Sequence, residues 1–153
     1  MINGVKIKEI KTHAHGRGNF QEILRDDDNL LEKFGQCSIT VTYPGVIKAF
    51  HWHKKQDDLW YAVSGNARVV LHDLRKESET YGQTQEIYMG ENSNNSRIVL
   101  IPKGVAHGYQ VLGNSNFTLM YFTTLSYDPK NPDEERISYD DKNINFDWTI
   151  KHE

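Results

Sequence analysis

Three histidines and a carboxylate with the spacing of a chemical site lie in two short stretches of this sequence. His51 and His53 are separated by one residue within GVIKAFHWHKKQDDLWYAVSG, which also contains Asp58. His107 follows later, in IPKGVAHGY. Residues i and i+2 of a strand point to the same face, so His51 and His53 can serve one site. Imidazole and carboxylate groups act as acid–base catalysts and as ligands of Zn, Fe, Ni or Mn.

Short strands are expected to position these residues. Alternating or β-branched runs separated by Gly, Asn, Ser or Pro predict about nine strands. The runs include residues 5–10, 16–24, 36–43, 58–64, 66–74, 85–89, 97–101, 108–112 and 117–124. The segment Asp26–Phe34 has capping aspartates, an apolar face and a following glycine, and it predicts the only helix. This pattern indicates an all-β antiparallel sandwich or barrel in which the C-terminal segment wraps the body through Phe146 and Trp148.

The strand predicted at 36–43 has two faces of different character. Its polar face, which includes Gln36 and Thr40, is expected to meet solvent or, in a barrel, to line a wet cavity. Its other face carries Cys37, which is expected to be a small buried apolar residue.

Composition restricts the class of protein. The chain has 153 residues, of which 25% are charged, and a formal net charge of -3. Nucleic-acid binding is not expected, because it usually needs a basic excess. One cysteine excludes an intramolecular disulfide and indicates a reducing compartment. With no signal-peptide core and no apolar run of membrane-spanning length, we expect a single soluble cytoplasmic domain over residues 1–153.

The spacing of the two stretches resembles the two motifs of the cupin superfamily. Gly45 is followed by five residues, His51, one residue, His53, four residues and Asp58, and Pro-x-Gly precedes His107 by two residues. The resemblance implies a double-stranded β-helix, or jelly roll. In metal-binding cupins these positions hold one divalent metal, so it also implies His51, His53, Asp58 and His107 as candidate ligands, with Asp where Glu is usual.

Longer segments resemble one branch of the cupins, the dTDP-4-dehydrorhamnose 3,5-epimerases. They are GRGNFQEIL, HDLRKESETYG, RIVLIPKGVAHGYQVL, YFTTLSYDP and ISYDDKNINFDW, and the match extends from Arg17 to Trp148. The resemblance implies a cofactor-independent homodimer that epimerises a dTDP-4-keto-6-deoxyhexose at C3, C5 or both. The resemblance places such a reaction in the biosynthesis of deoxysugars or surface polysaccharides.

The same resemblance assigns roles to residues. The catalytic base falls on His51 and the catalytic acid on Tyr121. The positions that hold the nucleotide sugar fall on the following residues: Arg17, Phe20, Glu22, Gln36, Lys48 and His107. Arginine is usual where Lys48 stands, and lysine cannot give the bidentate phosphate contact of arginine.

Three positions depart from the epimerase pattern. Asp58 stands where the family has a lysine that stabilises the enolate, and His53 stands where glutamine is usual. The family orients its base histidine with an aspartate beyond the position of Trp148. Asp140, Asp141 and Asp147 are the candidates for that role here.

The departures leave two mechanisms in competition. His53 and Asp58 restore the ligand set of metal cupins, and a divalent metal could stabilise an enolate as a Lewis acid. A metal-bound His51, however, is not free to act as a base. Lys54 or Lys55 could instead reach the enolate oxygen, although turn lysines are usually solvated.

Other functions remain open. The sequence HWHKK also resembles the dTDP-4-oxo-6-deoxyglucose 3,4-ketoisomerases, in which a histidine pair moves a proton between C3 and C4. A metal-dependent sugar cupin and a non-catalytic carbohydrate-binding cupin are further alternatives. The remaining histidines are expected at the surface: His13, His15, His72 and His152.

Overall fold

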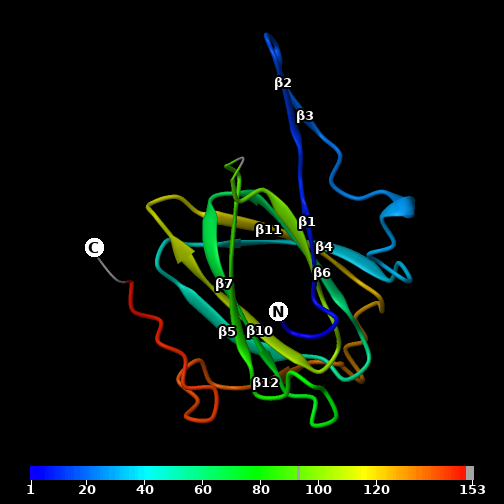
Figure 1. Ribbon diagram of the computed structural model, residues 1–153, viewed down its shortest axis with the longest axis vertical. Helices are drawn as coiled ribbons and strands as arrows, with labels where there is room; N and C mark the ends of the chain where they lie inside the picture. The colour runs from blue at the N-terminus through cyan, green and yellow to red at the C-terminus, as the bar shows by residue number, and fades with distance from the viewer. Residues whose placement is uncertain (93, 151–153) are drawn as a thin grey trace.

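Two antiparallel five-stranded sheets face each other and form the body of the protein (Figure 1). The computed structural model describes residues 1–92 and 94–150. The first sheet contains, in spatial order, β1 (Lys6–Glu9), β9 (Arg97–Ile101), β6 (Asp58–Ser64), β11 (Phe117–Thr123) and β4 (Gln36–Thr42). The second contains β12 (Glu135–Arg136), β5 (Ile47–Trp52), β10 (Val105–Leu112), β7 (Asn66–Asp73) and β8 (Thr84–Gly90). The predicted all-β jelly roll is confirmed.

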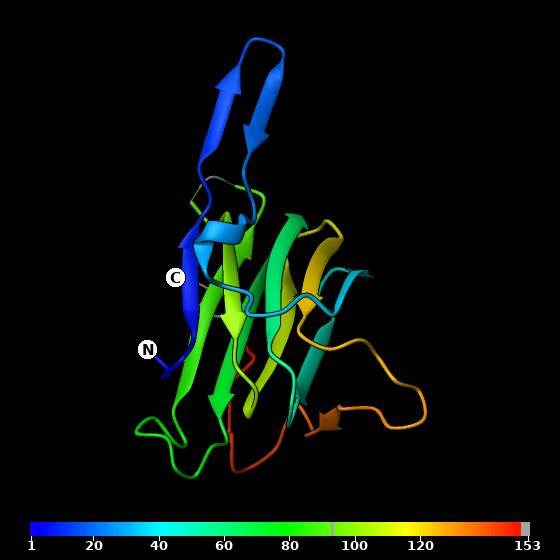
Figure 2. The same cartoon turned by 90° about the vertical axis from the view of Figure 1, so that its right-hand side faces the viewer.

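A hairpin stands away from this body. It consists of β2 (Thr12–His15) and β3 (Gly18–Gln21), which pair only with each other (Figures 1 and 2). We refer to residues 12–22 as the arm. Phe20 is 57% exposed on it, although burial of an aromatic side chain is normally favourable.

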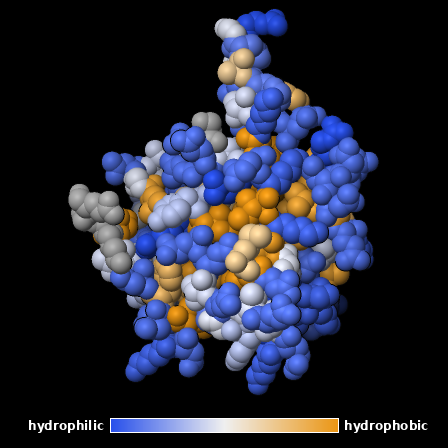
Figure 3. Space-filling view, in the orientation of Figure 1, coloured by the Kyte–Doolittle hydropathy of each residue, from blue (hydrophilic) through white to orange (hydrophobic). Residues whose placement is uncertain are grey.

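The apolar core fills one end of the space between the two sheets. The inward residues of the central strands form it, among them Trp60, Val69, Val99, Val111 and Phe117. The face of the molecule in Figure 3 is hydrophilic around its rim and on the arm, and apolar over the middle of the body. The other end of the same space is a cavity whose lining includes many polar side chains, among them Gln36, Thr40 and His51. The strands therefore run from a packed end to a hollow end.

Segments outside the sheets cover their outer faces. The C-terminal tail packs on the second sheet, where Trp148 contacts Phe50 at 5.6 Å between ring centroids and Phe146 at 4.7 Å. This confirms both predicted anchors. On the first sheet, Leu30 joins an apolar cluster with Leu59 and other outward residues.

The prediction of a helix over Asp26–Phe34 is wrong. The segment forms only a short 3-10 helix, η1 (Asp26–Asp28). Asn29 follows with φ of 52° in the left-handed region, which ends the helix. Leu30 and Leu31, which suggested a helical face, pack on the first sheet instead, whereas Phe34 is 65% exposed. No helix within residues 1–92 and 94–150 is long and apolar enough to cross a bilayer.

Two further predictions about burial are wrong. The polar face of β4 points inward, so Cys37 is exposed on the outside. His72 is buried rather than at the surface, because its strand, β7, lies between β10 and β8. The Nδ1 atom of His72 pairs with Thr84 Oγ1 at 2.8 Å. His13 and His15 are exposed, as expected, and His152 lies outside the described residues.

Replacement of Trp148 should test how much the tail stabilises the body. The side chain is 8% exposed and its Nε1 donates to the Tyr139 carbonyl at 2.9 Å. Trp148→Ala should lower the free energy of unfolding by about 3 kcal/mol, because a large buried ring and its hydrogen bond are lost. Urea unfolding measures this change. Ile150→Ala, at a position 47% exposed, is the control and should cost less than about 0.5 kcal/mol.

Candidate active site

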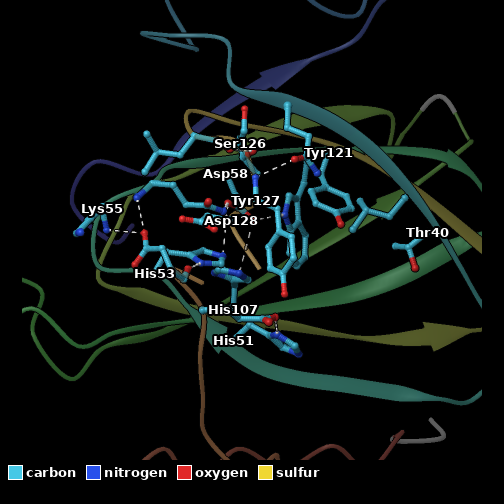
Figure 4. A pocket seen from close by; sticks show the side chains of 18 of the residues that line it. Thr40, His51, His53, Lys55, Asp58, His107, Tyr121, Ser126, Tyr127 and Asp128 are labelled. Atoms are coloured by element: carbon cyan, nitrogen blue, oxygen red, sulfur yellow. Dashed lines mark hydrogen bonds and ion pairs between the residues drawn. The ribbon is translucent and has the colours of Figure 1, made fainter. Parts of the chain in front are cut away.

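The hollow end of the barrel forms a cavity of about 600 Å³, within the range of small-molecule sites. Strands of both sheets and the loop after β11 line it (Figure 4). The cavity brings together most of the residues that the sequence singled out: Gln36, Lys48, His51, His53, Asp58, His107 and Tyr121.

Strand register explains how these residues meet. His51 on β5 lies directly opposite His107 on the neighbouring β10. Gly108 permits this pairing, since a Cβ there would lie 2.3 Å from the Ala49 Cβ. Tyr121 comes from β11 in the other sheet, between β6 and β4. The histidine and the tyrosine therefore enter the cavity from opposed sheets.

The loop before β12 supplies a carboxylate to His51. His51 Nδ1 and Glu134 Oε1 are 2.5 Å apart. Partial burial alone would raise the pKa of Glu134, but the hydrogen bond and charge of His51 outweigh it and lower that pKa. A neutral His51 that donates its Nδ1–H to this carboxylate has its lone pair on Nε2.

Glu134 is the functional residue that sequence reasoning missed. The carboxylate was sought at Asp140, Asp141 or Asp147, whereas Glu134 occupies that place. Asp141 instead accepts backbone N–H groups of residues 143 and 144. The acidic run DEE after Pro132 was the available signal, but only the fold brings it back to β5.

A second group of ionisable residues lies deeper in the cavity. His53 Nε2 is 3.6 Å from Asp58 Oδ1, and His107 Nε2 is 3.7 Å from Asp58 Oδ2. All three residues are buried, and Figure 4 shows them grouped apart from Tyr121 and Thr40. Burial lowers the pKa of His107 to about 4, against the charge of Asp58, which would raise it.

The pKa values of the other two residues, His53 and Asp58, shift in directions that their mutual contact sets. Burial would lower the pKa of His53, but the interaction with Asp58 outweighs it and raises that pKa. Burial would raise the pKa of Asp58, but His53 and His107 together lower it. The carboxylate is therefore held in its anionic form.

The predicted metal ligands fit a metal in part. Donor atoms of His53, Asp58 and His107 lie within 4.8 Å of one another. His51 does not belong to this group among the described residues, and its Nδ1 faces Glu134. The donor set of two imidazoles and one carboxylate suits a divalent transition metal.

The two turn lysines differ in position. Lys54 Nζ pairs with Glu135 at 2.6 Å and lies over the Trp52 ring, which holds it at the surface. Lys55 lines the cavity. Of the two turn lysines, Lys55 is therefore the one for which contact with an enolate oxygen stays a prediction.

Three predicted substrate-binding residues do not line this chain's own cavity. Arg17, Phe20 and Glu22 lie on the arm and are exposed. Glu22 pairs with Arg25 at 3.1 Å. Their assignment to substrate stays a prediction.

Comparison with known families identifies the scaffold. A sequence profile of the dTDP-4-dehydrorhamnose 3,5-epimerases matches residues 1–153. The chain belongs to the dTDP-4-dehydrorhamnose 3,5-epimerase family. This confirms the resemblance that the sequence motifs carried and the class of enzyme, an isomerase.

Relatives of this epimerase family match nearly the whole chain. The chain is 58% identical over 151 residues to the spore coat polysaccharide biosynthesis protein SpsL of Bacillus subtilis, covering 99% of each chain. It is 34% identical over 152 residues to a probable low-salt glycan biosynthesis epimerase, Agl13, of Haloferax volcanii, covering 98% of this chain and 96% of the relative. Both names concern polysaccharide or glycan biosynthesis.

Solved structures of the epimerase family have the same fold. A dTDP sugar isomerase from Desulfovibrio desulfuricans superposes with a TM-score of 0.88 at 25% identity, covering 96% of this chain and 92% of that one. A dTDP-6-deoxy-D-glucose-3,5-epimerase from Legionella pneumophila, solved with dTDP-4-keto-L-rhamnose, gives a TM-score of 0.85 at 29% identity, covering 98% and 81%.

The buried imidazole of His107 should titrate far below the ordinary histidine range. We expect a midpoint near pH 4 in the metal-free protein, measured by NMR of the ring nitrogens, with a histidine-containing peptide as reference. Between pH 6.5 and 4 the unfolded chain then binds a proton here that the folded chain does not. This group therefore lowers the free energy of unfolding as the pH falls through that window. A midpoint at or above 6.5 would contradict the expectation.

Proposed function

We propose that this protein is an epimerase of a dTDP-linked 4-keto-6-deoxyhexose and that it acts next to the C4 ketone in polysaccharide biosynthesis. One observation carries the proposal. A histidine paired with a carboxylate, His51 with Glu134, faces the cavity that Tyr121 enters from the opposed sheet. Membership of the epimerase family and the names of its relatives support the same substrate class.

His51 is the base in this mechanism. The C4 carbonyl acidifies the hydrogens on C3 and C5, so a neutral imidazole can remove one of them and leave an enolate. Glu134 holds Nδ1–H and stabilises the imidazolium that forms. The lone pair on Nε2 is then the one that takes the proton.

Tyr121 is the acid. Inversion at carbon requires that the proton returns to the face opposite the one from which it left. Tyr121 comes from the first sheet and His51 from the second, and both line the cavity. A sugar bound between them would have the donor and the base on opposite faces, as inversion requires. The phenol gives its proton to carbon, and exchange with solvent restores both groups.

Gln36, Lys48 and His107 are the proposed substrate contacts within the chain. All three line the cavity. The Lys48 ammonium, exposed on the strand beside β10, can meet a diphosphate as a point charge. The arm residues Arg17 and Phe20 complete the nucleotide site in our proposal, and they do so from a second copy of the chain.

A homodimer is therefore part of the proposed function. β4 is an edge strand, so one row of its backbone groups has no ladder partner in the sheet. Its outer face presents Ile39 and Val41, which are 63% and 54% exposed. An open edge with an apolar face favours association, and the projecting arm offers a means to reach the partner's cavity.

The composition supports the remaining parts of the proposal. With a net charge of -3, nucleic acid is not proposed as a partner. The single cysteine supports the cytoplasm as the compartment, because disulfide bonding is not used.

The contacts of His53 favour epimerisation over 3,4-ketoisomerisation. A ketoisomerase would use both histidines of the pair to carry protons. Here His53 Nδ1 donates to the Asp133 carbonyl, and its Nε2 faces Asp58. Of the two, His51 is the one whose Nδ1 pairs with a carboxylate, as a catalytic base requires.

Deuterium uptake tests the assignment of base and acid. The protein would be incubated with dTDP-4-keto-6-deoxyglucose in heavy water, and the sugar read by mass spectrometry and product analysis. Wild-type protein should label C3 or C5 and form the epimer. His51→Asn should lose labelling by about 10³-fold, because no base remains. Tyr121→Phe should keep labelling but lose the epimer, since the base can return deuterium to its own face.

Other outcomes of this experiment would contradict the proposal. Epimer formation by Tyr121→Phe at the wild-type rate would exclude Tyr121 as the acid. Labelling by His51→Asn at the wild-type rate would exclude His51 as the base. Movement of the ketone from C4 to C3 would identify a ketoisomerase.

Replacement of Glu134 tests its role as the positioning residue. Glu134→Gln should lower kcat by about 100-fold, because the imidazolium loses its anionic partner. KM should change little, and Glu134→Asp should recover part of the activity. Glu135→Gln is the matched control, since Glu135 contacts the surface residue Lys54. Equal kcat values for the two glutamine variants would remove Glu134 from the mechanism.

A further inference from the structure

A second hollow lies on the outer face of the sheet that carries His51. It has a volume of about 360 Å³ and lies where β5 and β7 end and β10 begins. We call it the outer groove. Its lining residues are Trp52, Lys54, Leu74, Arg75, Lys103 and Gly104. None of the six lines the cavity of His51 and Tyr121, so the outer groove is a separate place on the molecule.

The floor of the outer groove is apolar. Side chains alternate along a strand, so Trp52 points away from the cavity that its neighbour His51 lines. Trp52 and Leu74 are both partly buried and pack at the edge of the cluster that contains Phe50 and Trp148. An indole beside a leucine offers a surface against which the C–H groups of a sugar ring can pack.

One wall of the outer groove is held in place by Arg75 and Gly104. The Arg75 guanidinium donates to the Asp73 carboxylate from Nε and Nη2, both at 2.8 Å, so its charge is balanced. Its aliphatic stem passes Gly104, where a Cβ would lie 2.5 Å from the Arg75 Cγ. The Leu74 N–H donates to the Gly104 carbonyl at 3.1 Å. The groove is therefore preformed, which lowers the cost of binding.

Two lysines supply the charge at the rim. Lys54 Nζ lies 5.6 Å from the centroid of the Trp52 ring and 2.6 Å from Glu135, which balances it. Among residues 1–92 and 94–150, no carboxylate pairs with the Lys103 ammonium, which is exposed. The rim thus carries one unbalanced positive charge on a chain whose net charge is -3. Such a local field attracts an anion.

We propose that the outer groove binds a glycosyl phosphate, with its phosphate at Lys54 and Lys103 and its sugar ring on Trp52 and Leu74. Both ammonium groups can give charge-assisted hydrogen bonds to a phosphate dianion. The volume lies near the lower limit of small-molecule sites, so it suits one sugar ring with its phosphate. This inference does not rest on the proposed function.

Backbone contacts at the groove provide reporters of binding. The Gly104 N–H donates to the His53 carbonyl at 2.8 Å, and the Lys103 N–H donates to Asp57 Oδ1 at 2.8 Å. An anion bound at the rim should alter the environment of both amides. The indole N–H of Trp52 reports on the floor in the same way.

A titration of full-length protein with α-D-glucose 1-phosphate, followed by ¹⁵N NMR at physiological ionic strength, tests the proposal. We expect saturable shifts of the Trp52 indole and of the Lys103 and Gly104 amides, with a Kd of about 1 mM. Free glucose and inorganic phosphate should each bind at least about tenfold more weakly, because each lacks half of the contacts.

Three variants define the contacts. Lys103→Glu should weaken binding of glucose 1-phosphate about tenfold, because the unbalanced charge at the rim is reversed. Lys76→Glu is the matched control, since Lys76 is exposed and does not line the groove, and its Kd should stay within about twofold of the wild type. Trp52→Leu should weaken binding of glucose 1-phosphate but not that of inorganic phosphate. If Trp52→Leu fails to fold by circular dichroism, Lys103→Glu provides the measurement.

Four outcomes would overturn the inference. Absence of saturable shifts at the three reporters would show that the groove binds no glycosyl phosphate. Shifts confined to His107 and Tyr121 would place the ligand in the cavity instead. An equal Kd for inorganic phosphate would leave only an anion site. An equal loss of affinity in Lys76→Glu and Lys103→Glu would mean that the general field of the surface, and not contact at the rim, attracts the ligand.

Discussion

The organisation of the cavity depends on the contacts that the dipeptide Asp133-Glu134 makes with the end of β5 and the turn after it. The Asp133 carboxylate accepts the backbone N–H groups of residues 54–56 at 2.8 to 3.0 Å. Its carbonyl orients His53, and the next side chain, Glu134, orients His51. Burial would raise the pKa of Asp133, but these backbone N–H groups outweigh it and lower that pKa. One short stretch thereby fixes the turn and both rings of the His-x-His pair.

The same strands carry both residues of the apolar core and ionisable residues of the cavity. β6 begins with Asp58 in the cavity and continues with Trp60 and Ala62 into the apolar core. β10 likewise carries His107 at the hollow end and Val111 at the packed end. Because these residues lie on paired strands, the ladder and the core hold the reacting groups in place.

The sequence predicted local features better than distant contacts. The strand pattern could be read from alternation, and the shared site of His51 and His107 came from the resemblance to the two cupin motifs. The tail anchors were suggested by two aromatic residues, Phe146 and Trp148, in a polar segment. The Glu134 contact could not, because it joins residues 83 positions apart through a loop without periodicity. The predictions of a buried Cys37 and of a helix at Asp26–Phe34 were wrong for a different reason. Alternation shows which residues share a face but not which face is inside, and an apolar stripe on a helix can equally cover a sheet.

The position of Glu134 links the opening of the cavity to the reactivity of His51. The loop that carries it also supplies wall residues of the cavity, among them Tyr127, Asp128 and Asn131. A displacement of this loop that widens the entrance would also withdraw the carboxylate from His51. The imidazole would then have its anionic partner only while the wall is closed around a bound sugar. Such an arrangement would confine proton abstraction to the enclosed state and protect a released keto sugar from further exchange.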